Sequence, residues 1–252
     1  MQIWQAVVLG LVEGATEFLP ISSTFHLIWT AKLLQIPAND FVKLFEVAIQ
    51  GGAILAVLFL YGRKISTKVM VSFVPTAVVG LVLYKIIKDV FFENMFLQLG
   101  MFAGVGLLFL LFEKMPIRQN KKVVDLTYVQ ALVIGLIQAL AVIPGVSRAG
   151  AVMLGMTGMG ISREESAKYS FLLAVPTILA ASAYDLWKMR SLLFGQIQNI
   201  ELLVIGSVVA FFSALIVIKW LIHFLQKNTL EGFGWYRLML ATLMFLLYYR
   251  EI

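Results

Sequence analysis

The sequence contains no cysteine and only two histidines. Without cysteine, disulfide bonds and thiolate ligands for a metal ion are excluded. Charged side chains are also scarce: Asp, Glu, Lys and Arg make up 13% of the chain, whereas soluble domains average about 25%. By contrast, 61% of the residues are hydrophobic and the mean hydropathy is +0.92. The composition therefore predicts an all-α integral membrane protein, with residues 1–252 forming a single polytopic membrane domain.

The charge that is present is mainly basic, with 20 Lys and Arg against 14 Asp and Glu and a net charge of +6. In a chain this apolar, excess basic residues are expected in loops on the cytoplasmic side of a membrane. We therefore expect membrane lipid, and no nucleic acid, as a partner.

Six apolar segments are long enough to cross a bilayer, for which a helix needs about 20 residues. They are residues 41–61, 66–88, 95–115, 164–188, 200–224 and 234–250. Two further apolar regions are divided by a proline into pieces of marginal length. The first comprises residues 2–19 and 21–36 on either side of Pro20, and the second residues 126–143 and 147–160 on either side of Pro144. We expect each to form a re-entrant helical hairpin.

The two broken regions resemble each other. The matching residues are Gln5 with Gln130, Ala6 with Ala131, Gly10 with Gly135 and Leu11 with Leu136, 125 apart, and Pro20 with Pro144 and Ser23 with Ser147, 124 apart. Residues 1–115 and 126–252 then form two halves, each with one hairpin and three spans. Because three is odd, the second half would enter the membrane upside down, which predicts an inverted repeat. Chance similarity between apolar helices is the alternative.

The basic residues favour one orientation. One predicted side carries nine of them, Arg63, Lys64, Lys68, Lys114, Arg118, Lys121, Lys122, Arg163 and Lys227. The other side carries six, Lys43, Lys85, Lys88, Lys188, Arg190 and Arg250. The first side is therefore predicted to be cytoplasmic. Both termini and the mouth of the first hairpin would then face outward.

The most polar stretch of the apolar sequence surrounds the first proline. Polar groups inside hydrocarbon are costly, so a cluster of them indicates a functional site. Glu13 and Glu17 are four residues apart on one helical face and can hold a divalent cation. After Pro20, the hydroxyl residues Ser22, Ser23 and Thr24 favour a helix N-terminus, which suits a phosphate group.

The second break adds an arginine. It reads Pro-Gly-Val-Ser-Arg from Pro144 to Arg148, and a guanidinium binds phosphate oxygens in a forked geometry. If the two breaks meet inside the membrane, we expect Arg148 to face Ser22, Ser23 and His26 and to complete a phosphate cradle. Two alternatives remain open: the serines, including Ser147, serve only as helix caps, or Arg148 is a counter-ion for Glu13 or Glu17.

These motifs are similar to known ones. The segments EGATEFLPISSTFH (residues 13–26) and PGVSRAG (residues 144–150) resemble the signatures of the undecaprenyl-diphosphate phosphatase family, the bacitracin-resistance proteins. The resemblance implies a multi-pass enzyme of the bacterial cell membrane. It would hydrolyse undecaprenyl diphosphate to undecaprenyl phosphate and phosphate, recycling the lipid carrier for peptidoglycan synthesis and conferring bacitracin resistance. It would need a divalent cation, usually Mg²⁺ or Ca²⁺.

The resemblance also implies residue roles. The acidic pair falls on Glu13 and Glu17, which we expect to bind the metal. The nucleophile falls on Ser23, the catalytic histidine on His26 and the phosphate-binding arginine on Arg148. We count Glu17 and Arg148 among the catalytic residues too, and expect Ser22, Thr24 and Ser147 to contribute to phosphate binding.

Two positions depart from the family pattern. Phe25 stands where the family usually has glycine, and Ala149 where it usually has serine. Phe25 adds bulk beside the expected site, and Ala149 removes one potential phosphate ligand.

A membrane transporter or flippase of a phosphorylated lipid or anion is the alternative function, because inverted repeats with broken helices are typical of transporters. Such a protein needs an anion site but no serine nucleophile beside an acidic pair. The sequence does not decide the oligomeric state and leaves a homodimer open. The site is expected to face outward.

Overall fold

The computed structural model describes the main chain of residues 1–91, 94–117, 121–194 and 196–249. It describes the side chains of residues 1–82, 94–117, 121–192 and 196–247. Of the basic residues counted for orientation, Arg118, Arg250 and the side chains of Lys85 and Lys88 lie outside these ranges. Within them the chain is helical and has no strand.

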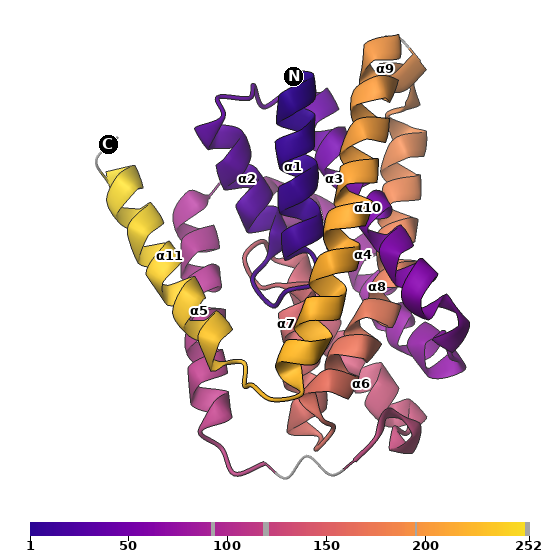
Figure 1. Cartoon of the computed structure of the whole chain (residues 1–252), viewed down its shortest axis with the longest axis vertical. Coiled ribbons are helices and arrows are strands. Elements are labelled where there is room, and N and C mark those ends of the chain that lie inside the picture. Colours follow the sequence, from indigo (N-terminus) through magenta and orange to yellow (C-terminus); the bar gives the residue numbers. More distant parts are fainter. Residues whose placement is uncertain (92–93, 118–120, 195, 250–252) are drawn as a thin grey trace.

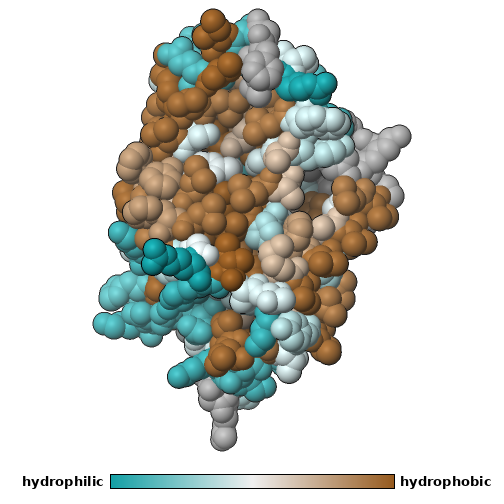
Figure 2. Space-filling model, turned by 90° about the vertical axis from the view of Figure 1, so that its right-hand side faces the viewer, coloured by the Kyte–Doolittle hydropathy of each residue, from teal (hydrophilic) through white to brown (hydrophobic). Residues whose placement is uncertain are grey.

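Six long helices form where the sequence predicts long apolar segments. They are α3 (Asp40–Tyr61), α4 (Thr67–Phe91), α5 (Met95–Glu113), α8 (Arg163–Lys188), α10 (Ile197–Leu225) and α11 (Glu231–Tyr249). Judged on the described residues alone, four are long and apolar enough to cross a membrane: α3 together with the short helix η1 (Gly62–Lys64), α5, α8 and α10. Hydrophobic side chains cover much of the middle of the face shown in Figure 2, and hydrophilic ones gather at its lower left and at its upper end. The prediction of an all-helical membrane protein is confirmed.

The two proline-containing regions are helix–break–helix units. The first consists of α1 (Ile3–Thr16) and α2 (Ser23–Leu33). The second consists of α6 (Tyr128–Ala139), the short helix η3 (Leu140–Val142) and α7 (Arg148–Gly158). Both connecting loops lie near the centre of the molecule (Figure 1). Two short helices, η2 (Val123–Asp125) and α9 (Arg190–Phe194), lie in segments that the sequence analysis treated as connections.

The two units share local structure. Both α2 and α7 contain 11 residues, and their first residues, Ser23 and Arg148, are 125 apart in the chain. Each is preceded by a serine with a positive φ, Ser22 at 66° and Ser147 at 72°. The structural correspondence therefore pairs Ser22 with Ser147, one residue away from the pairing of Ser23 with Ser147 in the sequence comparison.

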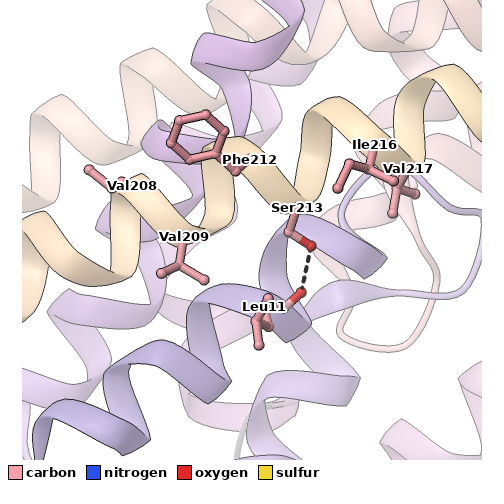
Figure 3. A pocket seen from close by; sticks show the side chains of 7 residues that line it. All are labelled: Leu11, Val208, Val209, Phe212, Ser213, Ile216 and Val217. Carbon is pink, nitrogen blue, oxygen red and sulfur yellow. Dashed lines mark hydrogen bonds between the residues drawn. The ribbon is translucent and has the colours of Figure 1, made fainter.

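Glycines allow the broken helices to approach their neighbours closely. A Cβ added to Gly10 of α1 would lie 2.6 Å from the carbonyl oxygen of Gly206 in α10. At the corresponding position in α6, a Cβ on Gly135 would lie 2.2 Å from the carbonyl oxygen of Ser72 in α4. Small residues are typical of such contacts between membrane helices. Next to the first contact, an apolar groove of about 320 Å³ runs between Leu11 and α10, where the Ser213 hydroxyl donates to the Leu11 carbonyl (Figure 3).

Candidate functional site

The two breaks meet at the carboxylate of Glu17. Glu17 is the C-cap of α1, while Ser23 and Arg148 are the first residues of α2 and α7. One oxygen of Glu17 forms an ion pair with the guanidinium of Arg148, and the other accepts a hydrogen bond from the Ser23 hydroxyl. Glu17 and Ser23 are buried and the Arg148 side chain nearly so. The structure thus brings three of the predicted site residues together, with Glu17 in contact with both Ser23 and Arg148.

The partner of Arg148 corresponds to one of the alternatives considered from the sequence. We expected Arg148 to face Ser22, Ser23 and His26, whereas it pairs with Glu17. The physical reason is the cost of burying an unpaired guanidinium, which a nearby carboxylate offsets. The arginine remains beside Ser23 through the shared carboxylate of Glu17.

Glu13 lies one helical turn before Glu17 and is 0% exposed. Within the described part of the chain, neither of its carboxylate oxygens has a hydrogen-bond partner. A buried carboxylate without a partner is costly and suits a bound cation. The same part of the chain has no group of three or more His, Cys, Asp or Glu side chains that could hold a metal. An ion here would therefore need other oxygen ligands in addition to those of Glu13 and Glu17.

His26 is hydrogen-bonded through both ring nitrogens. Nδ1 lies 2.8 Å from the carbonyl oxygen of Ser22, and Nε2 lies 2.7 Å from the hydroxyl of Tyr236 in α11. Because a carbonyl can only accept, Nδ1 carries a proton, which in the neutral ring leaves Nε2 to accept from Tyr236. The expected nucleophile, Ser23, instead donates to Glu17. The carboxylate, not the imidazole, is therefore placed to take the proton of Ser23.

The remaining hydroxyl residues differ in their surroundings. The Ser147 hydroxyl accepts from the Gly150 amide at 3.2 Å and donates to the Leu19 carbonyl at 3.5 Å, so it caps α7 and links the two breaks. Ser22 is the N-cap of α2, but its side chain makes no capping hydrogen bond. Thr24 is half-buried in the first turn of α2. Two helix N-termini therefore lie beside the ion pair, a favourable environment for a phosphate.

Two site residues on α11 were missed by the sequence analysis. One is Tyr236, the partner of His26. The other is Arg237, which is 0% exposed and donates to the carbonyl oxygens of Pro20 and Gly145 in the two breaks. An arginine inside a predicted spanning segment is itself a signal of function and could have identified this position.

The two departures from the family pattern are packed among apolar side chains. The Phe25 ring stacks on Phe102 of α5 with centroids 4.1 Å apart, and belongs to a buried cluster that includes Trp29. Ala149 belongs to the largest buried cluster, together with Phe109. Both positions thus contribute apolar packing beside the polar centre.

An apolar cavity adjoins the first break. Its volume is about 380 Å³, and it is lined by Leu19, Ile21, Phe224, Gly232, Phe233 and Tyr236. Leu19 and Ile21 flank Pro20, and the hydroxyl of Tyr236 contacts His26. The cavity thus borders both the first break and the Tyr236 hydroxyl that binds His26.

The sequence matches the family described as bacitracin resistance protein BacA over residues 6–243. The chain belongs to this family. Among similar members, a protein of Sulfurihydrogenibium sp. (strain YO3AOP1) is 42% identical over 98% of this chain and 100% of its own length. A protein of Aquifex aeolicus (strain VF5) is 44% identical, with 96% of each chain covered. A third, of Campylobacter hominis, is 42% identical over 96% of this chain and 97% of its own. All three are named undecaprenyl-diphosphatase.

The family membership and the geometry concern the same residues. The Glu17, Ser23 and Arg148 contact joins the two motifs on which the family resemblance was recognised. The catalytic roles of these three residues stay predictions. The same holds for the roles of the other predicted site residues, Glu13, His26, Ser22, Thr24 and Ser147.

We expect a strong energetic coupling between Glu17 and Arg148. Replacing either residue by Gln should lower the free energy of unfolding by about 3–5 kcal/mol, because the other charge is left buried without its partner. The double variant should lose less than the sum of the two, with a coupling energy above about 1 kcal/mol. Chemical denaturation in detergent micelles measures the free energy of unfolding of the wild type, the two single variants and the double variant.

The matched control is the half-exposed pair Glu164–Lys168 of α8, whose coupling energy should stay near or below about 0.5 kcal/mol. Equal coupling energies for the Glu17–Arg148 and Glu164–Lys168 pairs would contradict the view that the breaks depend on the Glu17–Arg148 pair.

Proposed function

We propose that this protein hydrolyses undecaprenyl diphosphate to undecaprenyl phosphate and phosphate. The observation that carries the proposal is the hydrogen bond from Ser23 to Glu17, made beside Arg148 and two helix N-termini. The activity would recycle the lipid carrier for peptidoglycan synthesis and confer resistance to bacitracin. The family membership and the names of the relatives support the same conclusion.

The first chemical step uses Ser23. Its Oγ attacks the terminal phosphorus while Glu17 accepts the hydroxyl proton. The new Oγ–P bond forms as the bridging P–O bond breaks, and undecaprenyl phosphate leaves. Water then cleaves the phosphoserine, releasing phosphate and regenerating the hydroxyl. Arg148 and the N–H groups at the starts of α2 and α7 oppose the charge of the transferring phosphoryl group.

The roles of the other polar residues follow from their positions. Ser22, Thr24 and Ser147 lie at the two helix N-termini and would contact phosphate oxygens, Ser147 by turning its hydroxyl away from the Leu19 carbonyl. His26 has an acceptor nitrogen paired with Tyr236, and is the alternative base or nucleophile. The resemblance implies that His26 is the catalytic histidine, whereas the hydrogen bond of Ser23 favours Glu17 as the acceptor of its proton.

A divalent cation, Mg²⁺ or Ca²⁺, fits the acidic side of the site. Glu13 offers two buried oxygens without partners, and Glu17 follows one turn later. When bound, such an ion supplies positive charge that neutralises diphosphate oxygens. Glu13 would hold it from α1, and Glu17 would contribute by sharing an oxygen that now contacts Arg148 or Ser23.

The substrate carries a long apolar tail that also needs a place. The cavity lined by Leu19, Phe233 and Tyr236 is apolar and borders the first break, so we assign it to the first isoprenoid units. This assignment favours a lipid diphosphate over a soluble one.

The proposed membrane layout has two re-entrant hairpins and six spanning helices. The two helix–break–helix units, with equivalent helices 125 residues apart, support an inverted repeat with halves 1–115 and 126–252. The start of α1 and the end of α11 lie at the same end of the molecule in Figure 1, as six crossings require. We place this end outside the bacterial cell membrane, so that the site faces outward. The homodimer left open by the sequence stays a prediction.

A transporter or flippase of a phosphorylated lipid is the competing function. It would use the anion site but has no need for the carboxylate that accepts from Ser23. The serine–carboxylate contact therefore favours hydrolysis.

Replacing Ser23 or Arg148 by Ala should lower turnover of undecaprenyl diphosphate at least about 100-fold, because each removes a group that acts in the transition state. Phosphate release by purified protein measures this, and Ser213→Ala, at the α1–α10 contact, is the control that should keep wild-type turnover. Quenching during turnover of labelled substrate should trap phosphate on Ser23. Label on His26, or near-normal turnover of Ser23→Ala, would show that the serine is not the nucleophile.

Chelation should abolish activity, and Mg²⁺ should restore it. In Glu13→Gln, the concentration of Mg²⁺ that gives half-maximal activity should rise at least about tenfold, because one anionic ligand is lost. The control, Glu201→Gln, changes an exposed carboxylate of α10 and should behave as wild type. Full activity in a strong chelator would show that the reaction does not require a divalent cation.

Filling the apolar cavity should weaken substrate binding. Gly232 lines the cavity, and an added Cβ meets nothing within 4 Å, so Gly232→Leu can be accommodated. Its KM for undecaprenyl diphosphate should rise about tenfold, the scale for losing one or two apolar contacts. The matched control is Gly104→Leu on α5, where the surroundings are equally open. An unchanged KM, or an equal rise in both variants, would remove the cavity from the substrate path.

Single cysteines can test the orientation, because the natural chain has none. A membrane-impermeant maleimide should label Gln2→Cys in intact cells. Lys122→Cys, on the side predicted to be cytoplasmic, should react only after permeabilisation. The opposite pattern would invert the proposed topology.

A further inference from the structure

Arg237 binds both breaks at once. Its Nη1 donates to the carbonyl oxygen of Pro20 at 3.1 Å, and its Nη2 donates to that of Gly145. Its Nε donates to the carbonyl oxygen of Phe102 in α5 at 2.9 Å. A single guanidinium on α11 therefore links the loop between α1 and α2, the loop between η3 and α7, and the neighbouring helix α5.

The surroundings hold this guanidinium in place. It lies 4.3 Å from the ring centroid of Phe102, whose ring also stacks on Phe25 of α2. Gly106 provides the space, since a Cβ added there would lie 2.9 Å from the Cβ of Arg237. Gly234 lets the two helices approach, since its own added Cβ would lie 2.9 Å from the Gly106 carbonyl oxygen.

The arrangement is costly for a residue that serves only to fill space. Its hydrogen bonds go to neutral carbonyl groups, so no partner in these bonds offsets the burial of the positive charge. What the guanidinium offers is a rigid fork of several donors. A hydrophobic side chain of similar volume would leave the carbonyls of both breaks without these hydrogen bonds.

The bonded carbonyls lie close in the chain to the reacting groups. Pro20 is three residues from both Glu17 and Ser23, and Gly145 is three residues before Arg148. We propose that Arg237 is a positioning residue, which sets the separation of the two breaks and thereby places Ser23 and Glu17 against Arg148. The kinetic consequence rests on the proposed function, whereas the structural consequence does not.

The kinetic test compares Arg237→Gln and Arg237→Lys with wild type. Arg237→Gln should lower kcat for undecaprenyl diphosphate about 100-fold, the effect of a misplacement near 1 Å, with KM changed less than about threefold. Arg237→Lys keeps the charge but not the fork, so it should recover only part of kcat.

A matched control separates positioning from stability. Arg163 is another largely buried arginine, which pairs with Glu113. Arg163→Gln should lower the thermal unfolding midpoint as Arg237→Gln does, yet keep the wild-type kcat per folded molecule. If kcat falls in both variants in proportion to lost stability, Arg237 is a structural residue and the proposal is wrong.

A second pair of variants applies even where Arg237→Gln does not fold. Gly106→Ala moves Arg237 without changing it, whereas Gly104→Ala, on the same helix, adds a Cβ in open space. Only Gly106→Ala should lower kcat. Equal kcat values in the two variants would count against the proposal.

The structural test needs no activity. Spin labels at Leu33→Cys and Tyr128→Cys, both exposed, report the separation of the two helix–break–helix units by pulsed electron paramagnetic resonance. Arg237→Gln, or Gly106→Ala in its place, should broaden the distance distribution relative to wild type and to Arg163→Gln. An unchanged distance distribution would contradict the proposal that Arg237 sets the separation of the two breaks. If wild-type protein releases no phosphate, the proposed function fails while this measurement still decides the role of Arg237.

Discussion

The ion pair between Glu17 and Arg148 joins the two places where the apolar helices are interrupted. Neither charge is stable in apolar surroundings alone, and each comes from a different break. The main chain at a break has the same difficulty, because its polar groups lack helical partners. Cross-links such as the Ser147 hydroxyl to the Leu19 carbonyl help meet this need. Each break is therefore stable only because the other faces it.

The features that are costly for folding are also those suited to the chemistry. Interrupting two helices at the centre of the molecule creates two N-termini, whose free N–H groups bind anions. Glu13 is buried without a hydrogen-bond partner in the described structure, so its charge can attract a cation. Closing the site around a diphosphate and a cation would relieve both costs. In the proposed function, folding thus leaves the Glu13 carboxylate and the free N–H groups of the two helices to be paired by the cation and the substrate.

Local sequence was sufficient to predict the elements and their breaks. Apolar run length predicted the long helices, and Pro20 and Pro144 marked the two interruptions. The polar residues at the site were identified because they stand out in an apolar chain. The position of each helix start was less certain: the positive φ of Ser22 and Ser147 shows that these two serines correspond, although the letters alone had paired Ser23 with Ser147.

The partners of those residues could not be predicted in the same way. His26 and Tyr236 are 210 residues apart, so no local pattern connects them. Arg237 lies near the start of a predicted span, where charged residues often reach the membrane surface. The Gly106–Gly234 contact instead packs this part of α11 against α5 in the interior. Tertiary packing therefore determines which groups Arg237 binds, the carbonyl oxygens of both breaks.

The two halves do not contribute equally to the site. The positions 125 residues after Glu13, Glu17 and His26 hold Gln138, Val142 and Ala151. The Gln138 amide nitrogen donates to Thr76 at 2.8 Å and to Thr177 at 3.2 Å, whereas its carbonyl oxygen, like both oxygens of Glu13, has no partner among the described residues. The second half thus lacks the acidic pair and the histidine, and its helix begins with Arg148 where the first has Ser23. In the proposed function, these two similar backbones would bind one diphosphate between them, with Ser23 and Glu17 contributed by the first half and the guanidinium of Arg148 by the second.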